Sequence, residues 1–309
     1  MALTEAPKDR ELPPTKEQIY RAVFDGLKRA YQLHQSLGDE GRTALSQNEF
    51  GDLALVMDVE AENTVLNSLR KLNIPLQIFS EEHGSFTDGE NPAHTIILDG
   101  LDGSAEYKEK RGESMYGTMV SVMDGNNPTY DDYLVSGIMI HSPRPELLIA
   151  IKGEGCFRVD IATGERELIE KKPKSELSQD TVIDLDINWP LLSGVYEDSE
   201  NKKNFPFMQC AFRSQAARTA LFINGAIDFQ LEVTRKGSVE GLRQGNLEMP
   251  PTYGLVRELG GVMVTAEGAS LGSRQYRTFD QDGVNIPIIV APNQEHAAQL
   301  ANRLSLNVA

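Results

Sequence analysis

Residues 97–104 read Ile-Leu-Asp-Gly-Leu-Asp-Gly-Ser and place two carboxylates, three residues apart, directly after an apolar run. The run Thr95–Leu98 predicts a short buried strand. The glycine after each aspartate lets the backbone turn sharply and expose its amides and carbonyls. Such a turn can aim the side chains of Asp99 and Asp102 and the Leu101 carbonyl at one point. Oxygen ligands of this kind suit Mg²⁺ or Mn²⁺ better than zinc.

The same turn offers a place for an anion. The backbone amides of Gly103 and Ser104 could hold a phosphate, particularly if a helix begins there. The alternative interpretation is a solvated hairpin turn, because Asp-Gly pairs are common in such turns. Taken alone, the motif leaves both interpretations open.

Acidic residues also lie at the ends of other predicted elements. Glu81 and Glu82 follow the apolar run 74–79. Asp58 stands at a predicted helix start, and Glu248 comes just before another helix. Singly, the first pair could form a solvated loop, and Asp58 could be a helix N-cap. Acids from several elements can also converge, and a metal ion would let them do so without mutual repulsion.

The first half of the chain predicts two helices followed by an antiparallel meander. Thr15 and Gln18 have capping-box spacing, and apolar residues recur behind them at helical intervals, which predicts a helix to residue 31. The polar segment 34–52 has no period and predicts a mobile loop. A second helix is expected from Asp58. Turn sequences separate the expected strands, which are 95–98, 115–123, 133–141, 147–152 and 156–161.

The second half predicts a mixture of strands and helices. Strands are expected at 181–187, 262–265 and 286–291, and helices at 214–224, 251–259 and 294–304. The chain is therefore expected to be α+β and then α/β. The expected division is an N-terminal α+β domain of residues 1–180, with metal-binding motifs, and a C-terminal α/β domain of residues 181–309.

Composition excludes several classes of protein. The 309 residues carry a formal net charge of -16, which argues against binding a nucleic acid polymer, because that draws affinity from clustered Lys and Arg. No apolar stretch approaches the ~18–20 residues that span a bilayer, and the polar start of the chain shows no secretory signal. The two cysteines, Cys156 and Cys210, lack metal-binding spacing. A cytoplasmic protein that does not bind membranes is expected.

Five ordered stretches resemble the signature set of the inositol monophosphatase/fructose-1,6-bisphosphatase superfamily, a group of lithium-sensitive, Mg²⁺-dependent sugar phosphatases. The resemblance covers most of residues 15–265. It implies a layered αβαβα sandwich of the sugar-phosphatase type. The stretches read GDLALVMDVEAENTVL (51–66), FSEEHG (79–84), ILDGLDGSAEY (97–107), IAIKGEGCF (149–157) and LEMPPTYGLVRELGG (247–261).

Carried onto this sequence, the resemblance implies a centre of two or three Mg²⁺ ions, for which Mn²⁺ can substitute. Asp58, on a further and weaker metal, and Ser104 would be the catalytic pair that orients the attacking water. The implied metal ligands are Glu81, Asp99, the Leu101 carbonyl, Asp102 and Glu248. The implied substrate contacts are Gly103, Ser104, Arg213 and Ser214, the last two being equally typical of a helix start.

Two positions depart from the usual pattern of the superfamily. Gly100 stands where proline is usual, which makes the loop less pre-organised. Leu247-Glu248 stands where many inositol monophosphatases have Trp-Asp, and a glutamate there is closer to the fructose-bisphosphatase branch. The chain thus mixes features of both branches, and its sugar stays open.

The resemblance implies Mg²⁺-dependent hydrolysis of a small phosphorylated metabolite, either an inositol monophosphate or a sugar (bis)phosphate such as fructose 1,6-bisphosphate. The alternatives are a 3'(2'),5'-bisphosphate nucleotidase and a non-catalytic relative that binds metal or metabolite. Relatives form dimers and tetramers, so a homo-oligomer is expected. A bisphosphate would need cations for its second phosphate, and the candidates are Arg213, Arg218, Arg235, Lys236 and Arg243.

Overall fold

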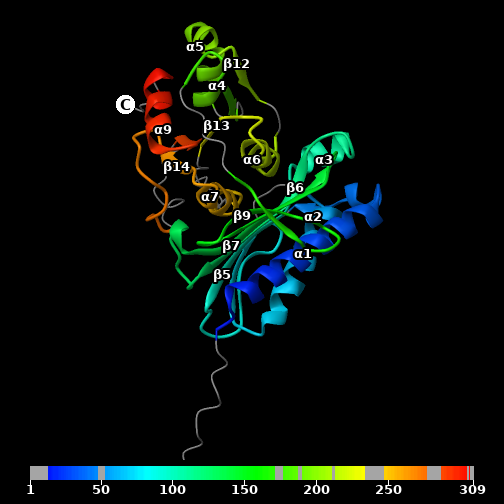
Figure 1. Ribbon diagram of the computed structural model, residues 1–309. Coiled ribbons are helices and arrows are strands. Elements are labelled where there is room, and N and C mark those ends of the chain that lie inside the picture. Colours follow the sequence, from blue (N-terminus) through cyan, green and yellow to red (C-terminus); the bar gives the residue numbers. More distant parts are fainter. Residues whose placement is uncertain are drawn as a thin grey trace, which may run out of the picture.

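The computed structural model describes residues 13–47, 53–170, 177–186, 190–210, 213–233, 247–276, 287–304 and 306. Their elements stack as alternating layers of helix, sheet, helix, sheet and helix (Figure 1). This arrangement confirms the layered αβαβα sandwich that the sequence resemblance implies.

The larger sheet contains the predicted meander. Its described strands lie in the order β10-β9-β8-β7-β6-β5-β3-β4. The β3–β5 pair is parallel and the other pairs are antiparallel. The apolar run at 74–79 supplies β3, and the expected strands from residue 95 onward supply β5 to β9. The bounds are β3 Leu76–Ser80, β4 Gly84–Asp88, β5 His94–Asp102, β6 Tyr116–Asp124, β7 Tyr133–Ser142, β8 Glu146–Ile151, β9 Gly155–Val159 and β10 Arg166–Leu168.

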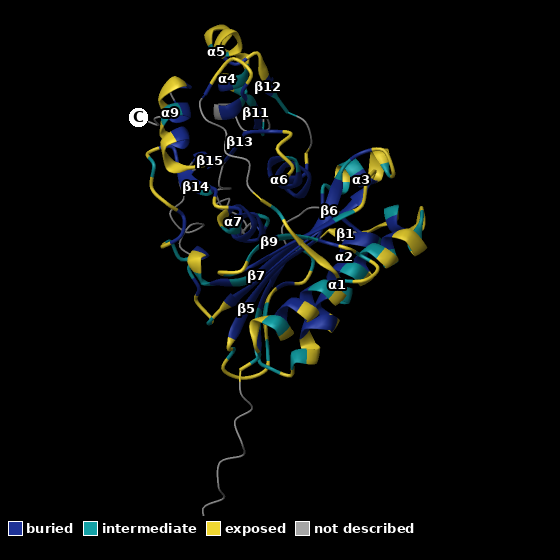
Figure 2. Cartoon of the chain, in the orientation of Figure 1, coloured by how far each residue is buried: buried dark blue, intermediate teal, exposed yellow. Residues whose placement is uncertain are grey.

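Two long helices, α1 (Lys16–Leu37) and α2 (Val56–Leu69), cover one face of this sheet. Their apolar sides enter one buried cluster with side chains of the sheet, for example Leu27 with Val120. In Figure 2 the buried sides of both helices turn toward the sheet and the exposed sides away from it. The predicted capping box of α1 is confirmed, since the Thr15 hydroxyl accepts a hydrogen bond from the amide of Gln18.

The loop predicted at 34–52 is partly wrong. The helix α1 continues through His34, and a short strand, β1 (Ala44–Gln47), pairs with β2 (Leu53–Leu55). Residues 48–52 lie outside the described part of the chain. Leu45 in β1 is 52% exposed and the buried residues of β2 are the adjacent Ala54 and Leu55, so neither short strand shows a period of two.

The middle layer consists of α6 (Gln215–Ile223) and α7 (Met249–Glu258), which lie between the two sheets. One hydrophobic cluster joins residues of these helices to both sheets, as with Ile138 from the larger sheet and Val290 from the smaller one. The two halves of the chain therefore share a core through this layer.

The smaller sheet has the described strand order β12-β11-β13-β15-β14 and is covered on its outer face by α4 and α9. The predictions missed α4, α5, β12 and β13. Two expected strands extend beyond the described part of the chain: the strand at 181–187 by its last residue and the strand at 286–291 by its first. The division at residue 180 stays a prediction. The bounds are β11 Val182–Leu185, α4 Pro190–Glu197, α5 Ser199–Asn204, β12 Phe207–Gln209, β13 Phe229–Val233, β14 Val262–Thr265, β15 Pro287–Ala291 and α9 Gln294–Arg303.

A single carboxylate ties the end of α7 to the larger sheet. Glu258 accepts hydrogen bonds from the Tyr133 hydroxyl at 2.5 Å, the Gly153 amide at 2.8 Å and the Gly155 amide at 3.0 Å. Because α7 starts next to Glu248, this contact fixes the far end of the element that carries one of the predicted metal ligands.

We expect Glu258→Ala to lower the free energy of unfolding by about 2–4 kcal/mol, because three donors lose a charged acceptor. Urea unfolding at neutral pH measures the change. The matched control is Glu154→Ala, an exposed glutamate on the same turn, for which a change within about 0.5 kcal/mol is expected. Equal losses in the two variants would show that the contact contributes little.

Candidate active site

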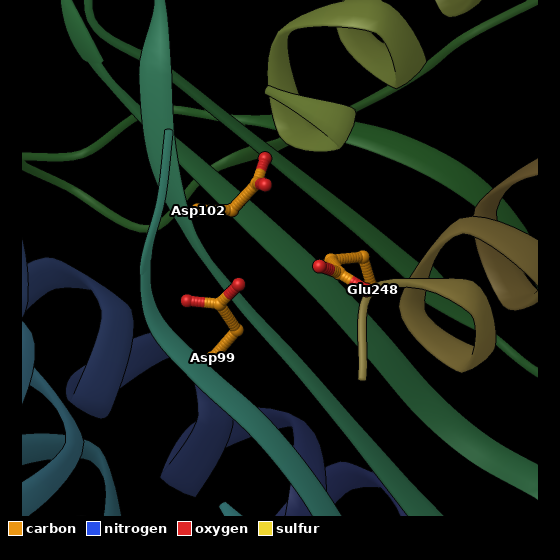
Figure 3. A group of neighbouring side chains, drawn as sticks. All are labelled: Asp99, Asp102 and Glu248. Carbon is orange, nitrogen blue, oxygen red and sulfur yellow. The ribbon is translucent and has the colours of Figure 1, made fainter. Parts of the chain in front are cut away.

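Three carboxylates from two elements converge at one end of the larger sheet. Asp99 and Asp102 belong to β5, and Glu248 immediately precedes α7. Each offers an oxygen atom, and these atoms lie within 4.8 Å of one another. In Figure 3 the carboxylate of Glu248 reaches toward Asp99 from the facing helix, while the carboxylate of Asp102 turns toward the start of α6. The structure thus brings together three of the residues that the sequence assigns to a metal centre.

The strand β5 is longer than predicted and carries a bulge at this point. Asp99 pairs with Met119 and Asp102 with Gly117, so β5 has one residue more than β6 between the two aspartates. The acids therefore lie within the strand and not after it. The amide of Leu101 donates to Asp99 at 2.9 Å, which helps to hold the bulge.

A left-handed glycine ends the strand. Gly103 has φ 91° and precedes α3 (Ser104–Lys110), so a helix does begin where the sequence suggests a phosphate could be held. A Cβ atom on Gly103 would lie 2.8 Å from the Cβ of Ser214. The glycine is therefore required both by the turn and by the close approach of α6.

The start of α6 fixes Asp102. One oxygen of its carboxylate accepts hydrogen bonds from the Ser214 hydroxyl at 2.7 Å and the Ala216 amide at 2.5 Å. The Ser214 oxygen also accepts from the Ala217 amide as the N-cap of α6. Ser214 is buried and engaged with Asp102, whereas the neighbouring Arg213 is exposed.

The sequence around Glu248 keeps its carboxylate free of the helix that follows. Glu248 is the N-cap of α7, yet its side chain caps no amide. An N-cap side chain normally accepts from the second or third residue of the helix, and here those residues are Pro250 and Pro251, which have no N–H. The glutamate is therefore available to a ligand outside the helix.

Asp58 and Ser104 lie beside the bulge. Asp58 is the third residue of α2 and not its N-cap, because the helix begins two residues earlier than predicted. Its carboxylate accepts from the Leu55 amide at 2.6 Å. The Ser104 hydroxyl lies 3.0 Å from the Leu101 carbonyl and 3.4 Å from an oxygen of Asp58. The two residues of the predicted catalytic pair are thus neighbours.

Sequence reasoning missed Glu62. This side chain is fully buried and accepts from the Ser80 hydroxyl, from the Glu81 amide at 2.9 Å and from the Glu82 amide at 3.2 Å. It therefore holds the turn that carries Glu81. The signal was present, since Glu62 follows Asp58 by four residues and so lies on the same face of the helix.

The crowding of these acids changes their protonation. Burial, followed by the charges of Glu248 and Asp58, raises the pKa of Glu81 well above its ordinary value. Burial and the charge of Glu81 do the same for the pKa of Asp99. Burial also raises the pKa of Asp58 to about 7 and that of Glu62 to about 8. Such shifts indicate a site that binds positive charge.

The donor set fits a hard divalent cation. Carboxylate oxygens dominate it, and in the described part of the chain no cysteine or histidine joins the cluster of Asp99, Asp102 and Glu248. The Leu101 carbonyl lies on the same bulge and accepts from Ser104. Oxygen-only donors of this kind favour Mg²⁺ or Mn²⁺ over zinc.

Arg218, one of the cationic candidates for binding a second phosphate, is already paired with carboxylates. Arg218 is buried, and its guanidinium is bonded to the carboxylates of Asp184 and Glu232, both at 2.5 Å, and to the Leu231 carbonyl at 2.8 Å. Two carboxylates neutralise this arginine, which removes it as a free phosphate ligand. Of the other candidates, Arg213 is exposed, while Arg235, Lys236 and Arg243 lie outside the described residues.

A layered αβαβα sandwich with carboxylates converging at a strand bulge defines the class of phosphatases to which the sequence motifs point. The chain matches the model of the inositol monophosphatase family over residues 9–307. It therefore belongs to the inositol monophosphatase family, whose members are typically metal-dependent, and it is a phosphatase.

Solved structures share the fold at low sequence identity. The extragenic suppressor protein suhB from Bartonella henselae has a TM-score of 0.70 and 18% identity, with 94% of this chain and 99% of that chain covered. Fructose-1,6-bisphosphatase from Leishmania major has a TM-score of 0.69 and 17% identity, with 96% of each chain covered. Inositol monophosphatase from Anabaena has a TM-score of 0.65 and 16% identity, with 94% and 97% covered.

No curated protein sequence matches the chain significantly. None of the helices in the described part of the chain combines the length and apolar character that a membrane crossing requires.

Gly100 provides a direct test of how the bulge packs. A Cβ atom there would lie 2.2 Å from the Asp58 carbonyl oxygen and 2.7 Å from Cγ of Glu62. We expect Gly100→Ala to push α2 away from β5, to cost about 1–3 kcal/mol of stability and to weaken divalent-cation binding. Urea unfolding and Mg²⁺ titration calorimetry measure the two effects.

The matched control is Gly194→Ala, because a Cβ atom there would meet nothing within 4 Å. This variant should bind Mg²⁺ like the wild type and should be at least as stable, since alanine favours the helix α4. Normal Mg²⁺ binding by Gly100→Ala would contradict the proposed packing.

The raised carboxyl pKa values predict how the metal-free protein responds to pH. In EDTA the folded state binds protons at Asp58 and Glu62 that the unfolded chain has already released, so the free energy of unfolding should fall as pH rises from 7 to 8.5. Each group contributes at most about 1.4 kcal/mol per pH unit. Burial lowers the pKa of His34, His83, His94 and His141, so these groups act in the opposite direction, and their effect fades above pH 7 as the unfolded chain also loses these protons.

Urea unfolding at several pH values in EDTA measures this slope. Glu62→Gln should flatten it, because the amide oxygen can still accept from the backbone while the titrating charge is gone. Saturating Mg²⁺ should also remove the slope. A free energy of unfolding that rises with pH in EDTA would contradict the prediction.

Proposed function

We propose that the chain is a Mg²⁺-dependent phosphomonoesterase that hydrolyses a small phosphorylated metabolite. The observation that carries this proposal is that carboxylate oxygens of Asp99, Asp102 and Glu248 lie within 4.8 Å of one another, on elements that different layers hold in place. The family match supports phosphatase chemistry, and the oxygen-only donors favour Mg²⁺, with Mn²⁺ able to substitute.

The proposed roles follow from the positions of the side chains. Glu81, the Leu101 carbonyl and the three converging carboxylates would hold two or three Mg²⁺ ions. When bound, these ions supply positive charge that stabilises the phosphoryl oxygens and acidifies water. Ser104 and Asp58, which lie 3.4 Å apart, would orient the attacking water and take up its proton.

The phosphate would lie against the start of α3. The amides of Gly103 and Ser104, which directly follow Asp102 at the start of α3, would position the phosphate for in-line attack. Arg213 and Ser214 would border the rest of the substrate. Since Ser214 already donates to Asp102, its contribution would be mainly to hold that ligand.

The pairing of Arg218 removes one of the five cationic candidates for a second phosphate. A second phosphate requires an uncompensated cation, and Arg218 is neutralised by Asp184 and Glu232. Carboxylates beside the site accept hydrogen bonds from hydroxyl groups, which suits a polyol. We therefore place inositol monophosphate ahead of fructose 1,6-bisphosphate and of 3'(2'),5'-bisphosphate nucleotides. We also propose that the protein is cytoplasmic and that it forms a homo-oligomer.

The experiment is phosphate release from a panel of substrates with Mg²⁺: inositol 1-phosphate, fructose 1,6-bisphosphate and a 3',5'-bisphosphate nucleotide. We expect the highest kcat/KM for the inositol phosphate, complete loss in EDTA and recovery with Mg²⁺ or Mn²⁺. Asp102→Asn should reduce kcat/KM by more than about 100-fold, because it removes a ligand charge while leaving the fold intact.

Unchanged melting in EDTA is the control for folding of Asp102→Asn. Hydrolysis by metal-stripped enzyme, or normal turnover by Asp102→Asn, would overturn the proposed chemistry. Preference for a bisphosphate would overturn the substrate assignment alone.

A further inference from the structure

A buried hydroxyl lies directly behind the metal-binding bulge. Thr118 is fully buried on β6, between the residues that pair with Asp99 and Asp102. Its hydroxyl lies 2.7 Å from the carbonyl oxygen of Gly100 and donates a hydrogen bond to it. Gly100 is the residue between Asp99 and Leu101, so this bond acts on the backbone that presents the predicted ligands.

A histidine orients this hydroxyl. Nε2 of His141 on β7 lies 2.8 Å from the Thr118 oxygen. A hydroxyl has one proton, and Thr118 uses it toward Gly100, so the histidine must be the donor and carry its proton on Nε2. Burial lowers the pKa of His141 well below its ordinary value, which keeps the ring neutral. The two hydrogen bonds therefore run in one direction: His141 donates to Thr118, and Thr118 donates to Gly100.

The surrounding side chains hold His141 rigidly. His34 of α1 stacks on it with ring centroids 4.9 Å apart, and Nε2 of His34 lies 3.1 Å from the Tyr116 hydroxyl. Within the described residues Nδ1 of His141 is buried and has no hydrogen-bond partner. A buried ring nitrogen without a partner costs free energy. The hydrogen bond between Nε2 and Thr118 offsets this cost and explains why the imidazole lies here.

A comparison pair exists on the same two strands. Ser121 of β6 and Ser136 of β7 are fully buried, and their hydroxyl oxygens lie 2.9 Å apart. Unlike the Thr118 hydroxyl, neither has a described hydrogen bond to the bulge. A substitution in the Ser121–Ser136 pair therefore measures what the loss of a buried hydrogen bond does to stability. A substitution at Thr118 measures that loss together with any specific effect on the metal centre.

We propose that Thr118 is a positioning residue of the metal centre: oriented by His141, it fixes the Gly100 carbonyl and thereby the direction of the Asp99, Leu101 and Asp102 oxygens. The proposal rests on the proposed Mg²⁺-dependent function. Mg²⁺ tolerates little error in ligand placement, with distances of ~2.0–2.1 Å, so a bulge free to shift loses affinity for the ion.

The test compares four variants with the wild type: Thr118→Val, Thr118→Ser, His141→Leu and Ser121→Ala. Titration calorimetry with MgCl₂ measures affinity without turnover, and melting in EDTA measures the fold. We expect Thr118→Val to weaken Mg²⁺ binding by about ten-fold or more, on the scale known for groups that orient metal ligands. His141→Leu should weaken it less, and Thr118→Ser, which keeps the hydroxyl, should restore it.

Ser121→Ala should lower the melting temperature in EDTA about as much as Thr118→Val and leave Mg²⁺ affinity unchanged. Wild-type affinity in Thr118→Val, or an equal loss in Ser121→Ala, overturns the positioning role. If Thr118→Val fails to fold, the comparison of His141→Leu with Ser121→Ala decides in the same way. A wild-type chain that binds Mg²⁺ and hydrolyses no phosphoester overturns the proposed function alone, whereas one that binds no Mg²⁺ overturns both.

Discussion

The carboxylates at the end of β5 repel one another, and the surrounding layers must hold them together against this repulsion. Oxygen atoms of Asp99, Asp102 and Glu248 lie within 4.8 Å of one another. Two unit charges at that distance repel by about 3–4 kcal/mol at an effective dielectric constant of ~20. Without a cation, burial and then this repulsion favour proton uptake, in agreement with the raised pKa of Asp99 and Glu81. The acids must therefore be held by contacts that do not depend on the ion.

Those contacts come from each neighbouring layer. The Ala216 amide at the start of α6 holds Asp102, and Glu62 on α2 holds the turn with Glu81. The prolines after Glu248 leave its carboxylate unused by α7. The groups that hold the ligands are backbone amides or fully buried side chains of regular elements, which keeps such a site closer to its working geometry than a site on loops. The shared core between the sheets is what brings Glu248 to β5.

The sequence predicted the parts of this arrangement that leave a local pattern. Asp99, Asp102 and Glu248 stood out because glycines, prolines and apolar runs surround them. Glu62 shares a helix face with Asp58, but its role was not predictable, because its partners, Ser80 and the two amides after it, are distant in sequence and only the fold joins them. The β1–β2 hairpin was missed for a different reason: its strands are short, and their exposed and buried apolar residues do not alternate. The bulge could not be predicted either, because the register between two strands depends on both of them.

Close packing and a hydrogen bond from neighbouring elements hold the backbone at Gly100. The sequence resemblance implies a proline at this position, and glycine lacks the restriction of the proline ring, at a cost of about 0.5–1 kcal/mol in chain entropy. The backbone of α2 approaches Gly100 so closely that the Asp58 carbonyl oxygen lies 2.2 Å from where a Cβ atom would be. The Thr118 hydroxyl holds the same residue through its carbonyl. The rigidity of the bulge thus comes from neighbouring elements, and because α2 also carries Asp58, any loosening of that contact moves a predicted catalytic residue and the predicted metal ligands together.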